Sequence, residues 1–402
     1  YGPYWGFEHV EFTSGHATKP LAHYGKWYHE HGGKDEWAIA KPVEGFDACP
    51  VTTMPENLHD SMFVGERAAA YISEHANGDQ PFFLTASFPD PHHPFNPPLE
   101  TALRYKDVPV KMPVNEDDNL HTRPRHYHYH QYGVWHRAGL LHPLPDMPEE
   151  DKEKCGKCAD QIAQFMDEKI LQGLGLLTHG DSSGEEYKPS VLSAHERDQR
   201  IRNTYAMVDL IDKGVGKILD ALKESGALED TVIIFTADHG ELMGDHGLWL
   251  KGPFFYDGLV NVPLMMHTPE DNASVTEALA SSVDIYPTCC ELLGVPTPRS
   301  CDGMSQAAAL RGEKIRTECL FEYRNGYFEN DVYTLGYVDE KYKFVQYQNG
   351  DVEMTDRIND PKENVNIVYN GANPELLAEY RNKLLNMMLN TASKFPEQYC
   401  HA

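Results

Sequence analysis

The stretch TVIIFTADHGELMGDHGLWLKGPFFYDGLVNVPLMM, residues 231–266, carries the strongest fold signal in the chain. Its first seven residues form a β-branched apolar run that predicts a buried strand, and a polar loop begins directly afterwards at Asp238. A second apolar run over 262–267 predicts another strand after the glycine-rich loop. Before this stretch, apolar residues recur at helical spacing over about 196–225. A helix, a strand, a polar loop and a further strand indicate an α/β sheet with crossover connections.

Similar elements are predicted towards the N-terminus and after the central stretch. Residues 81–88, PFFLTASF, form a short apolar run that a proline-rich stretch closes, which predicts a buried strand leading into an irregular loop. Helices are predicted over about 58–75 and 283–294. A large α/β domain is therefore expected over residues 1–310.

The C-terminal part has a different pattern. Residues 319–347 contain three alternating segments that are typical of a half-exposed antiparallel sheet. Apolar residues over 374–392 return to helical spacing. These features predict a smaller sheet-plus-helix domain over residues 311–402.

Regular patterning breaks down between about residues 100 and 185, which predicts an insertion or a lid over a site. This segment contains the histidine-rich stretch 121–137 and the pair Cys155 and Cys158. A single CxxC pair without a second ligand pair at recognisable spacing is a weak zinc signal. A histidine-rich lid is the favoured interpretation, and zinc binding is the alternative for the 121–158 region.

The composition limits the partners that the chain can have. Its 402 residues include 35 Lys and Arg against 62 Asp and Glu, a formal net charge of −27. A surface this acidic repels phosphate backbones and anionic lipid, and no apolar run approaches the roughly 18 residues of a membrane span. We therefore expect neither nucleic acid nor a membrane as partner.

The first residue, Tyr1, opens a segment that is typical of the middle of a domain, so we expect N-terminal material to be missing from this chain. A targeting signal would lie in that material. The 8 cysteines are scattered and do not decide the redox compartment. The sequence leaves the localisation open between secreted or periplasmic and cytoplasmic, and it gives no oligomeric state.

The clearest candidate for chemistry is the pair Asp238 and His239 at the end of the strand over 231–237. Ligands of open α/β sheets bind outside the carboxyl ends of strands. A carboxylate oxygen and an imidazole nitrogen presented together there can hold a divalent cation. The alternative is an aspartate that caps a loop above a packed histidine, and the pair alone favours that alternative.

The sequence on either side of Asp238 and His239 favours the metal-binding interpretation instead. Residues 231–266 resemble the metal-binding segment of the sulfatases in the alkaline phosphatase superfamily. The shared elements follow one another in the same order: an apolar strand, Thr-x-Asp-His-Gly-Glu, a Gly-Asp-His turn, a lysine and a second strand. Residues 81–98, 283–305 and 358–366 resemble three further sulfatase motifs in the same order. The resemblance extends from about residue 1 to residue 390. It implies an alkaline phosphatase-like fold, in which helices flank a large mixed sheet.

The resemblance also implies roles for individual residues. Asp238 and His239 are expected to ligate one divalent cation, Ca²⁺ first and Mn²⁺ as the alternative. Lys251 is expected to bind a sulfate oxygen and to offset charge on the leaving group. His92 of the Pro-His-His-Pro-Phe loop is expected to contact the sulfate or protonate the leaving oxygen, in preference to His93.

The chain departs from the family pattern in one important respect. Sulfatases use a Cys-x-Pro-x-Arg or Ser equivalent whose Cys or Ser becomes formylglycine, and neither Cys49 nor Ser87 starts such a cassette here. Formylglycine and two metal-binding aspartates are therefore expected in the missing N-terminal segment. The Gly-Lys-Trp-Tyr-His stretch from Gly25 to His29 resembles another sulfatase motif, but an ordinary helix with three buried aromatic residues is favoured.

Three functions follow from these observations. The first is a metal-dependent, arylsulfatase-like hydrolase that acts on a small-molecule or carbohydrate sulfate ester, although the 402 residues alone are expected to be inactive. The second is a phosphonate monoester or phosphodiester hydrolase of the same superfamily, since cationic groups serve either tetrahedral ester. The third is a catalytically inactive fragment, since the nucleophile and half of the metal ligands are not identifiable in this sequence.

Overall fold

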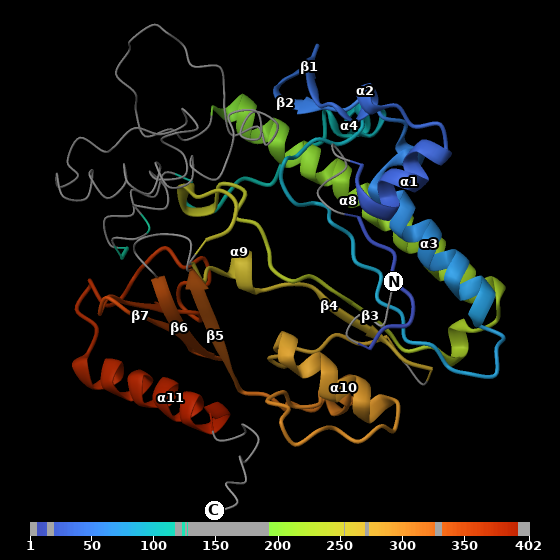
Figure 1. Ribbon diagram of the computed structural model, residues 1–402. Coiled ribbons are helices and arrows are strands. Elements are labelled where there is room, and N and C mark those ends of the chain that lie inside the picture. The colour runs from blue at the N-terminus through green and yellow to red at the C-terminus, as the bar shows by residue number, and fades with distance from the viewer. Residues whose placement is uncertain are drawn as a thin grey trace, which may run out of the picture. The chain divides into compact units, whose positions relative to one another are not determined.

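The structure is a computed structural model that describes residues 6–13, 20–116, 123–124, 127, 193–252, 254–269, 273–325 and 332–392. The described residues belong to two compact units, and each is considered separately (Figure 1). The first unit contains the described residues up to 112 together with 193–231, and the second contains those over 113–127 and 232–392. The domain boundary predicted at residue 310 stays a prediction.

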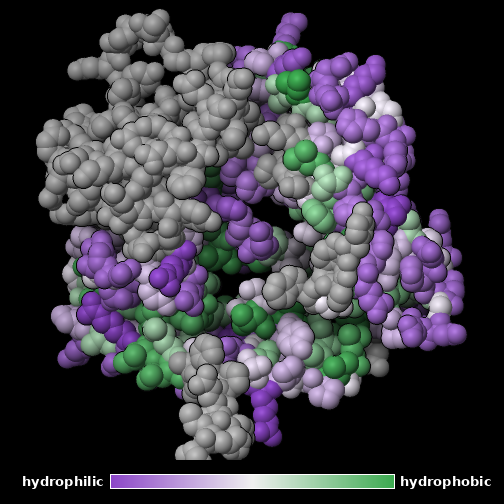
Figure 2. Space-filling model, viewed as in Figure 1, coloured by the Kyte–Doolittle hydropathy of each residue, from purple (hydrophilic) through white to green (hydrophobic). Residues whose placement is uncertain are grey.

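Helices dominate the first unit. Its helices are α1 (Ala22–Glu30), α2 (Asp35–Ala38), α3 (Asp60–His75), α4 (Leu99–Tyr105) and α8 (Ala194–Glu224), and its strands β1 (Lys41–Val43) and β2 (Phe46–Val51) pair antiparallel. Hydrophilic side chains cover the outer side of α1 and α3, at the right of the view in Figure 2. Apolar side chains of the same helices are buried, as expected of amphipathic surface helices.

The ends of α8 show why this helix forms where the sequence predicts it. Ser193 and Glu196 form a capping box at its start, in which each side chain accepts from the other residue's backbone N–H group. At its end, Gly226 adopts a positive φ of 72°. The N–H of Ala227 then donates to the carbonyl of Leu222 at 2.9 Å, which completes a Schellman motif. Local capping therefore confirms the helix predicted over about 196–225.

Two glycines allow α3 and α8 to lie close together. A Cβ atom on Gly65 would lie 2.6 Å from the Cα of Gly214, and one on Gly214 would lie 2.7 Å from the carbonyl oxygen of Ser61. Both contacts involve backbone, which cannot move aside as a flexible side chain can. The pair of glycines sets the spacing of these two helices and buries the N-terminal end of α3.

The second unit contains two sheets. Strands β3 (Ile233–Thr236) and β4 (Leu264–His267) pair antiparallel, with Ile233 opposite His267. Strands β5 (Glu318–Asn325), β6 (Val332–Asp339), β7 (Tyr342–Tyr347) and β8 (Val352–Asp356) form an antiparallel sheet in that order. Helices α9 (Asp257–Val260), α10 (Ile285–Leu292) and α11 (Pro374–Ala392) complete the unit. Tyr380 and Leu384 of α11 pack against Phe344 and Met354 of the four-stranded sheet.

Several predicted elements differ from the structure in detail. The run over 81–88 does not form a strand, because no strand of the described residues pairs with it. The two strands of the central stretch are antiparallel rather than joined by a crossover, since the residues between them contain only short helical turns and no helix long enough to return the chain. Strand β8 follows the predicted sheet region and was not predicted. No helix among the described residues is long and apolar enough to cross a membrane.

Candidate active site

The loop after β3 presents the predicted metal ligands of the second unit. Asp238 lies two residues beyond the end of β3, and its side chain is 87% exposed. Its Oδ1 accepts a hydrogen bond of 2.9 Å from the backbone N–H of His239. The other carboxylate oxygen, Oδ2, lies 3.5 Å from Nε2 of His239. The two predicted ligands therefore face one another at the carboxyl end of a strand.

The imidazole of His239 is oriented by the backbone and contacts Lys251. Its Nδ1 lies 2.8 Å from the carbonyl oxygen of Gly240, which only accepts, so Nδ1 carries the proton. Nε2 then has a free lone pair, and the ammonium of Lys251 donates to it at 2.7 Å. The structure thus brings together three of the four residues predicted for the site.

Backbone packing holds this loop in place. The N–H of Gly240 donates to the carbonyl of Leu259 at 2.8 Å. A Cβ atom on Gly240 would lie 2.0 Å from the carbonyl oxygen of Gly258, so only glycine permits this approach. The His239 ring is therefore anchored to α9 through its neighbour.

Lys251 follows a residue with an unusual backbone conformation. Leu250 has a φ of 62°, as an L residue rarely does, and Met243 and His246 of the same loop also have positive φ values of 52° and 55°. Such residues cost about 1–3 kcal/mol each and persist where the surroundings determine them. The side chain of Leu250 is buried, and this burial stabilises the turn that directs Lys251 towards His239.

Glu241 is a charged neighbour that was not assigned a role from the sequence. Burial raises the pKa of its carboxyl to about 7, while the backbone N–H of Met243 and the ammonium of Lys251 act in the opposite direction. The signal that could have identified it is its place in the Thr-x-Asp-His-Gly-Glu motif.

The pair Asp245 and His246 serves the loop itself. Asp245 accepts from the backbone N–H of Val114 at 2.7 Å. His246 is buried and stacks on the ring of Tyr256, with ring centroids 4.0 Å apart. Both contacts hold the turn in which the pair lies.

His92, the fourth predicted site residue, lies in the first unit. Its ring and that of His93 have centroids 3.9 Å apart, and its Nδ1 lies 2.6 Å from the carbonyl oxygen of His93. Both side chains are half-buried. Because His92 and Lys251 belong to different units, a joint role for them stays a prediction, as does the preference for His92 over His93.

The donor set of Asp238 and His239 fits a divalent cation. When two neighbouring ligand atoms each form a bond of about 2.3 Å to the same ion, they lie about 3.3 Å from one another. The 3.5 Å between Oδ2 of Asp238 and Nε2 of His239 is close to this separation. The hard oxygen suits Ca²⁺, and the softer nitrogen also suits Mn²⁺.

Two other predicted regions were not assigned to the site. The Gly-Lys-Trp stretch lies on α1, and Tyr24, Trp27 and Tyr28 are buried as the ordinary-helix interpretation requires. Of the 121–158 region, only Arg123, Pro124 and Tyr127 are described. The histidines of this region and its CxxC pair lie outside the described residues.

Comparison with known proteins identifies the family. The sulfatase family matches residues 14–295, and the family of N-sulphoglucosamine sulphohydrolase C-terminal regions matches residues 244–390. The first match covers well over half of the chain. This chain belongs to the sulfatase family of the alkaline phosphatase superfamily.

Individual relatives agree with this assignment. An arylsulfatase of Clostridium perfringens is 24% identical over 90% of this chain and 64% of its own length. A structure solved in complex with its substrate D-glucosamine-2-N,6-O-disulfate has a TM-score of 0.61 and 21% identity, over 85% of this chain and 71% of that one. The phosphonate monoester hydrolase of Agrobacterium radiobacter has a TM-score of 0.64 and 23% identity, over 92% of this chain and 69% of that one.

These structural similarities confirm the predicted alkaline phosphatase-like α/β fold class with its C-terminal antiparallel sheet and helix. The chain spans less than two thirds of the length of several curated relatives, with shares of 56, 62 and 64%.

Proposed function

We propose that this chain is the larger part of a metal-dependent sulfatase that hydrolyses a sulfate ester of a small molecule or carbohydrate. The observation that carries the proposal is the contact of Lys251 with His239 beside Asp238, at the end of a strand in a chain of the sulfatase family. A cation site next to a fixed ammonium is suited to an anionic tetrahedral ester.

Asp238 and His239 would hold one divalent cation, Ca²⁺ first and Mn²⁺ as the alternative. Such an ion supplies Lewis-acid stabilisation of a sulfate oxygen when it is bound. Because Nδ1 of His239 is committed to Gly240, its Nε2 lone pair is available either to the cation or to Lys251. In the loaded enzyme, the ammonium of Lys251 would therefore be released to contact the ester.

Lys251 would offset the negative charge that develops on the leaving oxygen as the S–O bond breaks. His92 would then donate a proton to that oxygen. The 402 residues contain no Cys-x-Pro-x-Arg or Ser equivalent, so the proposal assigns attack on sulfur to a formylglycine outside them, and the isolated chain is expected to be inactive.

Phosphonate monoester or phosphodiester hydrolysis is the second candidate. The observation that favours it is the similarity in fold to the phosphonate monoester hydrolase, which is as high as that to the protein solved with D-glucosamine-2-N,6-O-disulfate. An ammonium beside a divalent cation also stabilises a phosphoryl oxygen. Members of one family can differ in this choice, because function resides in the site rather than in the fold.

The test begins with the coding DNA upstream of Tyr1. If an in-frame Cys-x-Pro-x-Arg or Ser equivalent is found, the extended protein is assayed on an aryl sulfate and on an aryl phosphodiester, beside the 402-residue chain. Faster turnover of the sulfate supports the first proposal, and faster turnover of the phosphodiester supports the second. Sulfate hydrolysis that survives Asp238→Ala or Lys251→Ala would contradict the assigned site. An upstream reading frame that encodes no such nucleophile supports the third hypothesis, a catalytically inactive fragment.

A further inference from the structure

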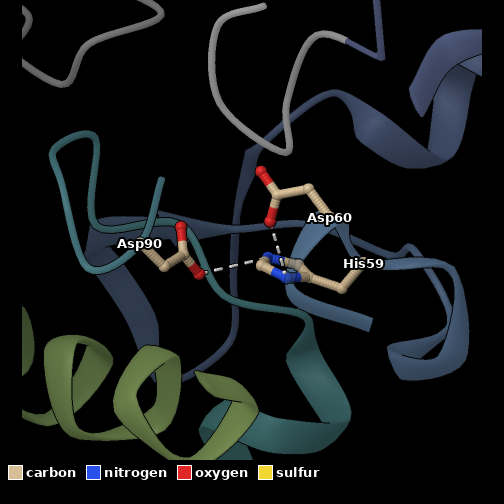
Figure 3. A group of neighbouring side chains, drawn as sticks. All are labelled: His59, Asp60 and Asp90. Atoms are coloured by element: carbon tan, nitrogen blue, oxygen red, sulfur yellow. Dashed lines mark ion pairs between the residues drawn. The ribbon is translucent and has the colours of Figure 1, made fainter. Parts of the chain in front are cut away.

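A second group of potential metal ligands lies in the first unit and consists of residues to which no role was assigned above. His59 precedes α3, Asp60 is the first residue of α3, and Asp90 comes from the loop before His92. Figure 3 shows the imidazole of His59 between the two carboxylates. Nδ1 of His59 lies 3.0 Å from Oδ1 of Asp60, and Nε2 lies 3.5 Å from Oδ2 of Asp90.

All three side chains are almost completely removed from solvent. Their exposed fractions are 1% for His59, 0% for Asp60 and 1% for Asp90. Gly214 of α8 packs against the backbone of Ser61, and the hydroxyl of Tyr24 donates to the carbonyl of Leu58 at 2.9 Å, so α8 and α1 both help to enclose the group. Water is therefore a poor partner for these carboxylates.

The surrounding protein offers the carboxylate oxygens few polar partners, namely the imidazole of His59 beside both carboxylates and the hydroxyl of Ser61 beside Asp90. Among the described residues, none of the four oxygens of Asp60 and Asp90 receives a hydrogen bond of normal geometry. Buried carboxylates ordinarily accept several hydrogen bonds or bind a cation, since leaving such a group unpaired is costly. The imidazole alone faces both carboxylates.

Charge balance points in the same direction. Two carboxylates and a neutral imidazole carry two negative charges, which a buried site does not tolerate. A divalent cation neutralises both, and the alternative is that two protons occupy the group.

The spacing of the donor atoms suits an ion. One donor atom from each of the three residues can be chosen so that all lie within 4.8 Å of one another. Ligands of an ion with bonds of about 2.1 Å are separated by about 3–4 Å, so small side-chain rotations are enough to close the group around it.

We propose that His59, Asp60 and Asp90 form a buried binding site for a divalent transition-metal ion, separate from the cation site of Asp238 and His239. One imidazole nitrogen and two carboxylates favour Zn²⁺ or Mn²⁺ over Ca²⁺, which prefers six to eight oxygen ligands, and over Mg²⁺, which retains several waters. The ion links the start of α3 to the loop that carries His92, and its role is to fix that loop.

The experiment measures Zn²⁺ binding by calorimetry on the full chain after treatment with a chelator. The starting protein carries Asp238→Asn and His239→Gln, so that the other proposed site does not contribute. We expect His59→Gln and Asp90→Asn, each added to it, to weaken Zn²⁺ binding at least about tenfold, because removing even an outer-shell partner of a ligand costs about 10–100-fold.

His195→Gln is the matched control. Nε2 of His195 also lies 3.0 Å from an aspartate oxygen, Oδ1 of Asp47, but both side chains are exposed, and no third ligand among the described residues is near enough to complete a group. Its substitution should leave Zn²⁺ affinity unchanged. Zinc that is held elsewhere, for example by histidines of the 121–137 stretch, would not respond to substitution of His59 or Asp90.

A second measurement uses the unsubstituted chain, in case the variants fail to fold. Anomalous diffraction at the zinc absorption edge, on crystals of the full chain grown with excess Zn²⁺, should show a peak among His59, Asp60 and Asp90. Absence of that peak, or equal Zn²⁺ affinity in the folded His59 and Asp90 variants and their parent, overturns the proposal. The group would then hold protons only.

Discussion

The ammonium Nζ of Lys251 lies 2.7 Å from Nε2 of His239, the same nitrogen that a cation bound to Asp238 would use. The lysine and the cation therefore compete for one lone pair. Since Nδ1 of His239 donates to Gly240, the ring cannot serve both by changing its tautomer. This competition links cation binding to the position of the lysine, and the first two predictions follow from it.

Lys251→Ala is expected to strengthen divalent-cation binding at Asp238 and His239 several-fold. The substitution removes both a competing donor and a positive charge that repels the ion. Ca²⁺ and Mn²⁺ titrations by calorimetry on the 402-residue chain measure the effect. Lys314→Ala, which removes an exposed lysine paired with Glu340, is the control. Weaker binding in Lys251→Ala would mean that the lysine supports the ion instead of competing with it.

The same Lys251→Ala substitution is expected to lower kcat for sulfate ester hydrolysis about 10²-fold in the extended protein, because loss of one group that stabilises developing charge typically costs 10²–10³-fold. Steady-state rates on an aryl sulfate measure this, again with Lys314→Ala as control. Tighter cation binding combined with slower turnover would separate the role of Lys251 from that of the ion. An unchanged kcat would exclude Lys251 from the chemistry.

His92 and His93 are distinguished by the same assay. We expect His92→Ala to lower kcat by at least about 10²-fold, as loss of a general acid does. His93→Ala should have a much smaller effect, through the loss of the ring contact with His92. The decrease in kcat caused by His92→Ala should be smaller for an ester whose leaving group is a stronger acid, since such a group departs without being protonated. The reverse order of effects would transfer the role to His93.

Gly65→Ala tests the close contact of α3 and α8. The added Cβ would lie 2.6 Å from the Cα of Gly214, so the helices must separate, and we expect a loss of about 1–3 kcal/mol of unfolding free energy. Gly216→Ala is the matched control, because no atom lies within 4 Å of a Cβ there. Because alanine has a higher helix propensity than glycine, Gly216→Ala should raise the free energy of unfolding by about 0.5–1 kcal/mol. Urea denaturation measures both changes, and equal effects would contradict the packing argument.

Glu56 provides a test of pH dependence. Burial alone would raise the pKa of its carboxyl, but hydrogen bonds from Lys213, Arg104 and Thr101 lower it to about 2. The folded-state pKa lies below the unfolded value of 4.5, so the unfolded chain binds more protons between these two values. The stabilisation is therefore complete above pH 4.5 and is lost as the pH falls through about 2.

Glu56→Gln should accordingly be less stable than the unsubstituted chain at pH 7, and the difference should decline as the pH falls below 4.5. Because the side chain of Glu56 is partly exposed, solvent screening reduces the expected difference to about 1 kcal/mol. Denaturation at a series of pH values measures it. Glu229→Gln, at an exposed carboxylate, controls for the change in net charge. A difference that does not vary with pH would exclude the ion pairs as its cause.

Much of the architecture was predictable because it depends on neighbours in the chain. The spacing of apolar residues and the caps at Ser193 and Gly226 define α8 through contacts within a few residues. The run over 81–88 shows the limit of such reasoning. Its composition is that of a strand, but a strand also requires a partner, and partners come from distant parts of the chain.

The sequence by itself determined the family, the helices and the order Asp238, His239 and Lys251, because motif spacing, periodicity and capping are local properties. The tertiary structure decided that Lys251 turns back onto Nε2 of His239, since this depends on the left-handed Leu250 and its burial. It also decided that Asp90 joins His59, 31 residues earlier in the chain, in a buried group. Burial and charge pairing between distant residues arise only from packing, so no local pattern in the sequence encodes them.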